Sequence, residues 1–266
     1  MARRARLDAE LVRRGLARSR EHAAELVAAG RVRLRGSVAA KPAAMLDPAD
    51  PVHVDEASTD DYVSRGAHKL AGALAAFGDL RVAGRRCLDA GASTGGFTDV
   101  LLRAGASEVV AVDVGYGQLA WTLRTDRRVR VLDRTNVRSL APEQLGGPVE
   151  LTVADLSFIS LRLVLPALHA CTVPDGDVVP MVKPQFEVGR ERVGKGGVVR
   201  DPKLRARAVL DVAESAATLG LGVAGLAVSP LPGPSGNVEY FLWLRRDAPA
   251  IDPAAVEALT GGGDDA

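Results

Sequence analysis

The chain has 266 residues, of which 47% are hydrophobic and 25% charged, a composition that is typical of a soluble globular protein and excludes a wholly disordered or collagen-like chain. No apolar run approaches the ~18 residues of a membrane span, and two cysteines, Cys87 and Cys171, make neither a disulfide framework nor a metal site at a recognisable spacing. The charged start offers no apolar signal segment, so we expect a cytoplasmic protein with both thiols buried and reduced.

Positive charge is concentrated at the front of the chain. Residues 1–50 hold eleven Lys and Arg against six Asp and Glu, a net +5, whereas the whole chain carries only +1. Because Lys and Arg dominate binding to phosphate backbones, a basic module on a near-neutral body suggests a nucleic-acid partner reached through the N-terminus. A solvated charged surface is the alternative.

The first sixty residues predict a small α+β module. Leu7, Leu11 and Val12 recur at helical spacing up to Gly15, and a second helix, capped by Ser19, ends at Gly30. Residues 31–35 then alternate between arginine and apolar side chains, as in a half-buried strand, and residues 52–54 are a candidate partner strand. Arginines of both helices and of the strand would form one basic unit.

An acidic, proline-containing stretch over residues 47–61 indicates a hinge or linker between two modules. We set the domain boundaries at 1–60 for the basic module, 61–64 for the linker, 65–248 for the body, and 249–266 for a flexible acidic tail without Lys or Arg.

The body alternates short apolar strands with amphipathic helices, beginning with a helix over residues 65–77. This alternation predicts a doubly wound α/β fold, whose mostly parallel sheet has helices on both faces. Two final strands, 222–228 and 238–244, are joined by a turn-rich link too short for a parallel crossover, so we expect an antiparallel hairpin at the end of the sheet. The other strands are expected at 87–90, 109–112, 129–132, 151–154 and 178–182.

A glycine-rich segment, residues 89–97, lies between the first of these strands and a helix, where doubly wound folds bind nucleotides. An ATP-binding loop would need Lys and then Ser or Thr after its last glycine, but Phe97 follows Gly96. A dinucleotide loop would need glycine where Ser93 stands. The remaining candidate is an S-adenosylmethionine (SAM) site, with an unliganded strand-to-helix turn as the alternative.

In a SAM site, Asp89 would close the strand and Gly91, Ser93 and Gly95 would form the loop. Asp113, at the end of the next strand, would hold the ribose hydroxyls. Asp133 or Asn136, after the third strand, would read the adenine amine; we favour Asn136 for the site.

Charged residues mark the carboxyl ends of further strands, where chemistry collects in such sheets. Asp155 ends the fourth strand and Lys183 the fifth. If the last strand is antiparallel, Glu239 at its start lies at the same edge, and Lys69 on the preceding helix could complete a cluster of alternating charge. Each alone would be an ordinary surface charge, but chance seldom puts three at one edge.

Six motifs closely resemble those of the TlyA family, in a match that spans nearly the whole chain. They lie at residues 63–70, 88–98, 112–118, 154–160, 182–187 and 232–239. The resemblance implies an S4-type RNA-binding domain joined to an FtsJ-like methyltransferase with a seven-stranded sheet. It also implies SAM as methyl donor and, as acceptors, ribose 2′-hydroxyls of cytidines in the 16S and 23S rRNA of the 30S and 50S subunits. The members are often labelled haemolysins.

The same resemblance makes Lys69, Asp155, Lys183 and Glu239 a catalytic Lys-Asp-Lys-Glu tetrad, and it implies that loss of the enzyme gives resistance to capreomycin and viomycin. RNA contacts are expected at Arg4, Arg6, Arg18, Arg20, Arg65 and Phe158. One departure is the linker, where related actinobacterial sequences have Trp at the position of Tyr62 and Arg at that of Asp60.

Methyl transfer to a hydroxyl needs an in-line arrangement and removal of the hydroxyl proton. Lys183 is the candidate base, but Asp155 and Glu239 favour its charged form, so it could instead orient the hydroxyl. Phe158 either stacks on the target nucleotide or belongs to the core. Arg65 and the loop 189–197 could grip phosphates or be solvated.

Three other functions compete with this reading. Residues 155–158 loosely match an amino-methyltransferase motif, against which the two lysines argue. A non-catalytic ribosome-binding or assembly factor would not need the tetrad. A cytolysin would need an amphipathic cationic helix, which we do not find in the sequence.

Overall fold

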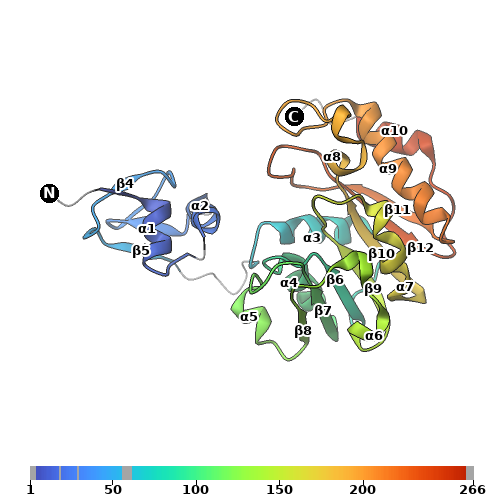
Figure 1. Ribbon diagram of the computed structural model, residues 1–266, viewed down its shortest axis with the longest axis horizontal. Helices are drawn as coiled ribbons and strands as arrows, with labels where there is room; N and C mark the ends of the chain where they lie inside the picture. The colour runs from blue at the N-terminus through green and yellow to red at the C-terminus, as the bar shows by residue number, and fades with distance from the viewer. Residues whose placement is uncertain (1–3, 18, 29, 56–61, 262–266) are drawn as a thin grey trace. The chain divides into compact units, whose positions relative to one another are not determined.

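A computed structural model describes residues 4–17, 19–28, 30–55 and 62–261. The chain divides into two compact units, residues 1–61 and residues 62–266 (Figure 1). Each unit has a hydrophobic core of its own.

The N-terminal unit pairs two helices with two small sheets. Helix α1 (Leu7–Arg13) and helix α2 (Arg20–Ala28) bury the apolar side chains expected from their spacing, among them Leu7, Leu11 and Val27. Strands β3 (Ser37–Val38), β2 (Val32–Leu34) and β5 (Val52–Val54) form one antiparallel sheet, which confirms residues 52–54 as the partner strand. Strands β1 (Ala5–Arg6) and β4 (Met45–Leu46) form the other, which the sequence analysis missed.

Acidic side chains neutralise much of the expected arginine face. Arg33 pairs with Asp55 at 2.9 Å and Arg35 with Asp50 at 2.6 Å. Residues 47–55 therefore belong to the N-terminal unit, and the assignment of this acidic stretch to a linker is wrong for them. Asp50 and Asp55 can form these ion pairs because β5 lies beside β2 and the turn that follows it, which carry the arginines.

The second unit is built on a seven-stranded sheet of order β11-β12-β10-β9-β6-β7-β8. Strands β8, β7, β6, β9 and β10 are mutually parallel, and β12 is antiparallel to both β10 and β11. The doubly wound fold and its terminal hairpin are thus confirmed. The strand bounds are β6 Arg86–Ala90, β7 Glu108–Val112, β8 Val129–Leu132, β9 Val149–Ala154, β10 Thr172–Val182, β11 Gly222–Val228 and β12 Tyr240–Arg245.

Helices cover both faces because successive strand residues point to opposite sides. In β6, Cys87 packs with the side chains of α3 and α4, whereas Leu88 packs with those of α7 and α9. The helix bounds are α3 Gly66–Ala76, α4 Gly96–Arg103, α5 Trp121–Arg124, α6 Pro142–Leu145, α7 Leu165–Ala170, α8 Pro184–Glu187, α9 Pro202–Ala217 and α10 Pro253–Gly261. Short 3-10 helices occupy Val137–Ser139, Leu161–Leu163 and Arg190–Arg192.

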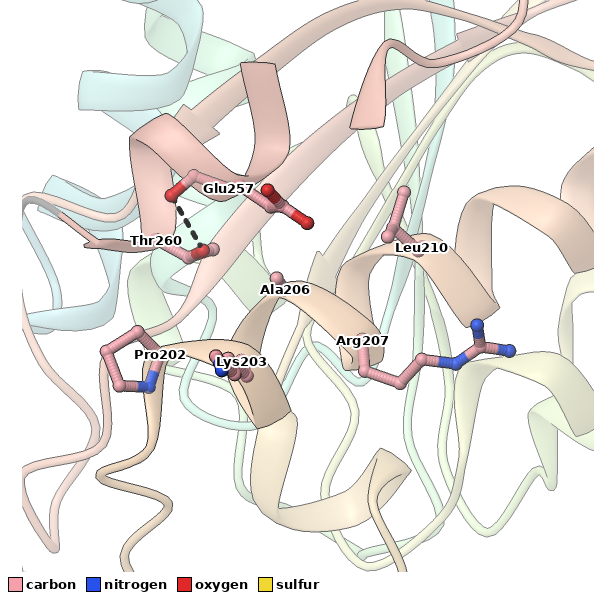
Figure 2. A pocket seen from close by; sticks show the side chains of 7 residues that line it. All are labelled: Pro202, Lys203, Ala206, Arg207, Leu210, Glu257 and Thr260. Carbon is pink, nitrogen blue, oxygen red and sulfur yellow. Dashed lines mark hydrogen bonds between the residues drawn. The ribbon is translucent and has the colours of Figure 1, made fainter. Parts of the chain in front are cut away.

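The expected flexible tail contains a helix. Helix α10 packs along α9 and buries Val256 and Thr260, and the two helices border a shallow pocket (Figure 2). A tail over all of 249–266 is therefore wrong for residues 253–261, because Val256 joins the core of the sheet domain. Among the described residues, no helix combines the length and apolar character that a membrane crossing requires.

Candidate active site

Two strand ends bring a lysine and an aspartate into contact. Asp155 directly follows β9 and Lys183 directly follows the neighbouring β10. The Lys183 Nζ lies 2.6 Å from Asp155 Oδ1 and donates a hydrogen bond to Ser157 Oγ at 3.0 Å. Both strand ends at one edge thus contribute to a single ion pair, in which Lys183 is buried and Asp155 is partly exposed.

A second pair joins the first helix of this unit to the last strand. Lys69, on α3, donates from Nζ to Glu239 Oε2 at 2.5 Å, and both side chains are buried. The other carboxylate oxygen of Glu239, Oε1, is buried without a hydrogen-bond partner among the described residues.

Strand register brings the two pairs to the same place. Val182 of β10 lies opposite Tyr240 of β12, so Lys183 and Glu239 are the next residues beyond this pair. Val182 and Tyr240 both face α9, and alternation turns the next residue of each strand toward α3, which carries Lys69. The four predicted side chains therefore meet at one edge and on one side of the sheet.

The glycine-rich loop packs against the backbone of Asp155, one of the four residues of this cluster. Gly91 has φ +87°, and a Cβ there would lie 2.4 Å from the backbone oxygen of Asp155. Gly95 has φ +98° and precedes α4. The side chains of Leu123 and Leu119 fill the space that a Cβ of residue 95 would need. The loop thus needs glycine for conformation and for close packing.

Ser93 and Asp113 are joined across this loop. Asp113 accepts hydrogen bonds from the Ser93 N–H at 2.8 Å and the Gly115 N–H at 2.7 Å. Each carboxylate oxygen keeps a second lone pair, as binding a ribose hydroxyl would require. Ser93 itself has φ +47°, a conformation that side chains rarely adopt.

The two candidates for reading adenine have different surroundings. Asp133 is held by Arg124 at 2.5 Å, whereas Asn136 is exposed and its side chain accepts from the Arg138 N–H. The adenine amine is a hydrogen-bond donor, so it cannot bind the Asn136 amide nitrogen, which is also a donor. To accept from the amine, the Asn136 side-chain oxygen would have to release the Arg138 N–H or accept both hydrogen bonds at once.

Asp89 is fully buried, one residue before the end of β6. Its Oδ2 accepts from Thr98 Oγ1 at 2.6 Å, whereas Oδ1 has no hydrogen-bond partner among the described residues. Burial, reinforced by the charges of Asp155 and Asp113, raises the pKa of Asp89 to about 7. The free oxygen and the neighbouring loop fit a ligand that carries a positive charge.

Phe158 is not a core residue, contrary to one of the two expectations. Its side chain is 92% exposed, its backbone has φ +65°, and its ring centroid lies 5.2 Å from that of Phe186. A large exposed aromatic in a strained conformation beside Asp155 is available for stacking.

The candidate RNA-binding arginines are spread over both units. Arg4 and Arg65 are exposed, whereas Arg6 and Arg20 share one carboxylate, Asp8, at 2.8 and 3.0 Å. Arg18 lies outside the described residues, as does Asp60. Tyr62 is the first residue of the second unit, and the Arg103 guanidinium of that unit lies 4.6 Å from its ring centre.

Sequence reasoning missed two groups at this edge. Ser157 contacts Lys183, and the buried Glu187 on α8 accepts from Ser160 and from the Leu161 N–H. Ser157 could have been found, because it lies two residues beyond a strand end. Glu187 ends the motif 182–187, but nothing in that motif indicates that its side chain is buried against the segment after β9.

Comparison with known proteins gives two matching family models. The FtsJ-like methyltransferase model matches residues 62–246 and the S4 domain model matches residues 5–52.

Similar proteins cover most of the chain. The 16S/23S rRNA (cytidine-2′-O)-methyltransferase TlyA of Mycobacterium tuberculosis is 66% identical over 98% of this chain and 100% of its own length. Hemolysin A of Brachyspira hyodysenteriae is 36% identical over 89% of this chain and 98% of its own. A solved structure from Streptococcus thermophilus, described as a candidate hemolysin, has a TM-score of 0.77 and 40% identity, and covers 98% of this chain and 96% of its own.

Proposed function

Because the chain belongs to the TlyA family of FtsJ-like methyltransferases, we propose that it transfers a methyl group from SAM to the ribose 2′-hydroxyl of cytidines in 16S and 23S rRNA. The observation that carries the proposal is the meeting of two lysines and two acids beside the glycine-rich loop. Ribosomal subunits as substrates imply a cytoplasmic site of action.

SAM fits the residues around the loop. Asp113 would hold the ribose hydroxyls, Gly91, Ser93 and Gly95 would let the ligand approach the backbone, and Asn136 would contact adenine. The buried free oxygen of Asp89 suits a cationic group, and the bound sulfonium supplies the methyl carbon.

Lys183 would aim the acceptor hydroxyl. Its Nζ forms an ion pair with Asp155 and donates a hydrogen bond to Ser157, an arrangement that suits a charged ammonium. Of the two roles considered for it, orientation of the 2′-oxygen is the better supported. The ammonium would donate a hydrogen bond to that oxygen and leave the other lone pair of the oxygen free to attack, and the hydroxyl proton would pass to water.

Lys69 and Glu239 would complete the electrostatics of the tetrad. Their contact leaves Glu239 Oε1 free to accept a hydrogen bond from the sugar, while Lys69 balances the buried negative charge. In this proposal Glu239 holds the ribose, and Lys69 holds Glu239.

RNA contacts would come from both units. Arg4, Arg6 and Arg20, with Arg18, would bind phosphates through the S4 domain. Arg65 would do the same near the site, and Phe158 would stack on the target nucleotide. Loss of the protein would then give resistance to capreomycin and viomycin.

The test is to incubate the purified protein with labelled SAM and each ribosomal subunit, then to digest the RNA with alkali. A methylated 2′-oxygen cannot attack the neighbouring phosphate, so the label should remain in alkali-resistant dinucleotides from both subunits. Label in mononucleotides would indicate base methylation instead. No transfer to either subunit, with binding retained, would favour the alternative of a ribosome-binding or assembly factor.

The hemolysin names attached to two similar proteins favour a cytolysin as a second candidate. A red-cell lysis assay with the purified chain tests it directly. We expect no lysis at concentrations that methylate rRNA completely.

A further inference from the structure

The segment that follows β9 carries three groups of the site without forming a helix or strand up to Leu161. Asp155 and Ser157 contact Lys183, and Phe158 projects into solvent with φ +65°. A left-handed conformation costs a bulky residue free energy and persists only where the surroundings hold it. Contacts from neighbouring elements must therefore hold this turn in its conformation.

Helix α8 and the residue before it grip the segment at three points. Lys183 contacts Asp155 and Ser157, and the ring of Phe186 packs at a tilt of 50° against that of Phe158. Glu187 binds the far end of the turn, where Oε2 accepts from Ser160 Oγ at 2.5 Å and Oε1 from the Leu161 N–H at 2.7 Å.

Glu187 is an unusual residue for this place. Its side chain is only 1% exposed, a cationic neighbour, Arg162, lies 3.7 Å away, and burial raises the pKa of its carboxyl. A buried carboxylate contributes little net stability compared with apolar packing, but two charge-assisted hydrogen bonds define a geometry.

We propose that Glu187 is a positioning residue for methyl transfer, which fixes the strained turn at Phe158 and thereby the pose of the acceptor nucleotide. This inference rests on the proposed methyltransferase function. It assigns Glu187 no contact with substrate, since its carboxylate is taken up by Ser160 and Leu161.

The test is a double-mutant cycle between Glu187→Ala and Phe158→Ala, read as single-turnover methylation of ribosomal subunits at saturating SAM. If Glu187 acts through Phe158, Glu187→Ala should slow the native protein on the order of 10- to 100-fold. The same change should slow the Phe158→Ala protein about 3-fold or less. Glu187→Gln, which keeps the length and an acceptor for the Leu161 N–H, should recover most of the rate.

Asp177→Asn is the matched control. Asp177 is equally buried and accepts two hydrogen bonds, from Arg85 and Trp243, but it lies in the middle of β10 and does not contact the turn at Phe158. Asp177→Asn should lower the unfolding midpoint, and its effect on the methylation rate should be the same in the native and the Phe158→Ala proteins.

In the rate and SAM-binding measurements, either of two results would overturn the inference. One is an equal rate loss from Glu187→Ala in both Phe158 backgrounds, and the other is a loss of SAM affinity that accounts for the slower rate. Amide hydrogen exchange at Leu161 is a readout that needs no activity, and Glu187→Ala should accelerate it at least tenfold. If Glu187→Ala accelerates exchange at Leu161 but the native protein methylates no rRNA, the proposed function is wrong. If Glu187→Ala leaves this exchange unchanged, the role of Glu187 is wrong.

Discussion

At the residue scale, each lysine of the site has an acid of its own. Lys69 contacts Glu239, and Lys183 contacts Asp155. Opposite charges in contact at a buried edge hold each other in place, so the polar atoms that face the substrate are oriented before it binds.

The Lys69–Glu239 pair should separate stability from activity. Glu239→Ala leaves a buried ammonium without its partner and should cost about 3–5 kcal/mol of unfolding free energy. The double variant Lys69→Met with Glu239→Leu should recover most of that stability in urea denaturation and still transfer no methyl. A double variant no more stable than Glu239→Ala would mean that the unpaired charge is not the cause.

Asp89 should make stability fall as pH rises. Its pKa is about 7 in the folded protein and 3.8 in the ordinary carboxyl, so the folded state binds the extra proton between these values. Unfolding free energy should therefore decline through this window, by up to about 4 kcal/mol, and stay low above it.

Asp89→Asn isolates that effect because it keeps an acceptor for Thr98. The difference in urea midpoint between the native protein and this variant should be small near pH 4 and should favour the variant above pH 7. A difference that does not change with pH would show that Asp89 ionises normally.

Residues at strand ends were predictable, and residues that act through others were not. Asp155, Lys183 and Glu239 follow or precede apolar runs, so topology alone sends them to one edge. Glu187 reaches Ser160 and the Leu161 N–H only when α8 folds back on the segment after β9, a contact that the motif 182–187 does not reveal.

At the element scale, the junction between β6 and α4 connects the glycine-rich loop to the end of β9. The loop carries Gly91 against the backbone of Asp155, and Gly96 against Ser64 and Ala67 at the start of α3. Movement of the loop would therefore disturb both Asp155 and the helix that carries Lys69.

Gly91→Ala should damage this junction more than a conformational penalty alone would. Its positive φ costs about 1–2 kcal/mol for alanine, and the new Cβ would also overlap the Asp155 carbonyl. We expect weaker SAM binding by calorimetry and a lower unfolding midpoint. Gly84→Ala is the control, because it has φ +78° with no atom within 4 Å. Equal effects of the two substitutions would contradict the packing argument.

Long strands and helices followed from apolar periodicity, whereas short elements did not. Strands β1, β3 and β4 have two residues each and exist only through their partners. Helix α10 was not predicted because the sequence around it is acidic and ends in glycines. Val256 and Thr260 nevertheless form a buried pair at i, i+4 spacing.

At the scale of the whole molecule, the charge asymmetry expected to drive RNA binding is partly cancelled within the first unit. Arg33 and Arg35 have acid partners, so fewer cations remain for RNA than the count of arginines suggests. Composition predicted the sign of this unit correctly but could not predict the pairing, which depends on how β5 returns to β2.

Arg20 should contribute one phosphate contact. Arg20→Ala should weaken binding to 30S subunits and lower the slope of log affinity against log salt by about 1. Arg207→Ala removes the same charge from a side chain of similar exposure, 56% against 59%, on α9. It should leave the slope unchanged, and an equal effect of both variants would contradict a specific role for Arg20.

The most direct measurement is single-turnover methylation of 30S and 50S subunits by Lys183→Ala, with bound SAM confirmed by calorimetry. The account predicts unchanged SAM affinity and a fall of at least ~100-fold in alkali-resistant label. Lys203→Ala, at an exposed lysine on α9, should behave like the native protein. Normal turnover by Lys183→Ala would contradict a reaction centre built on these four charges.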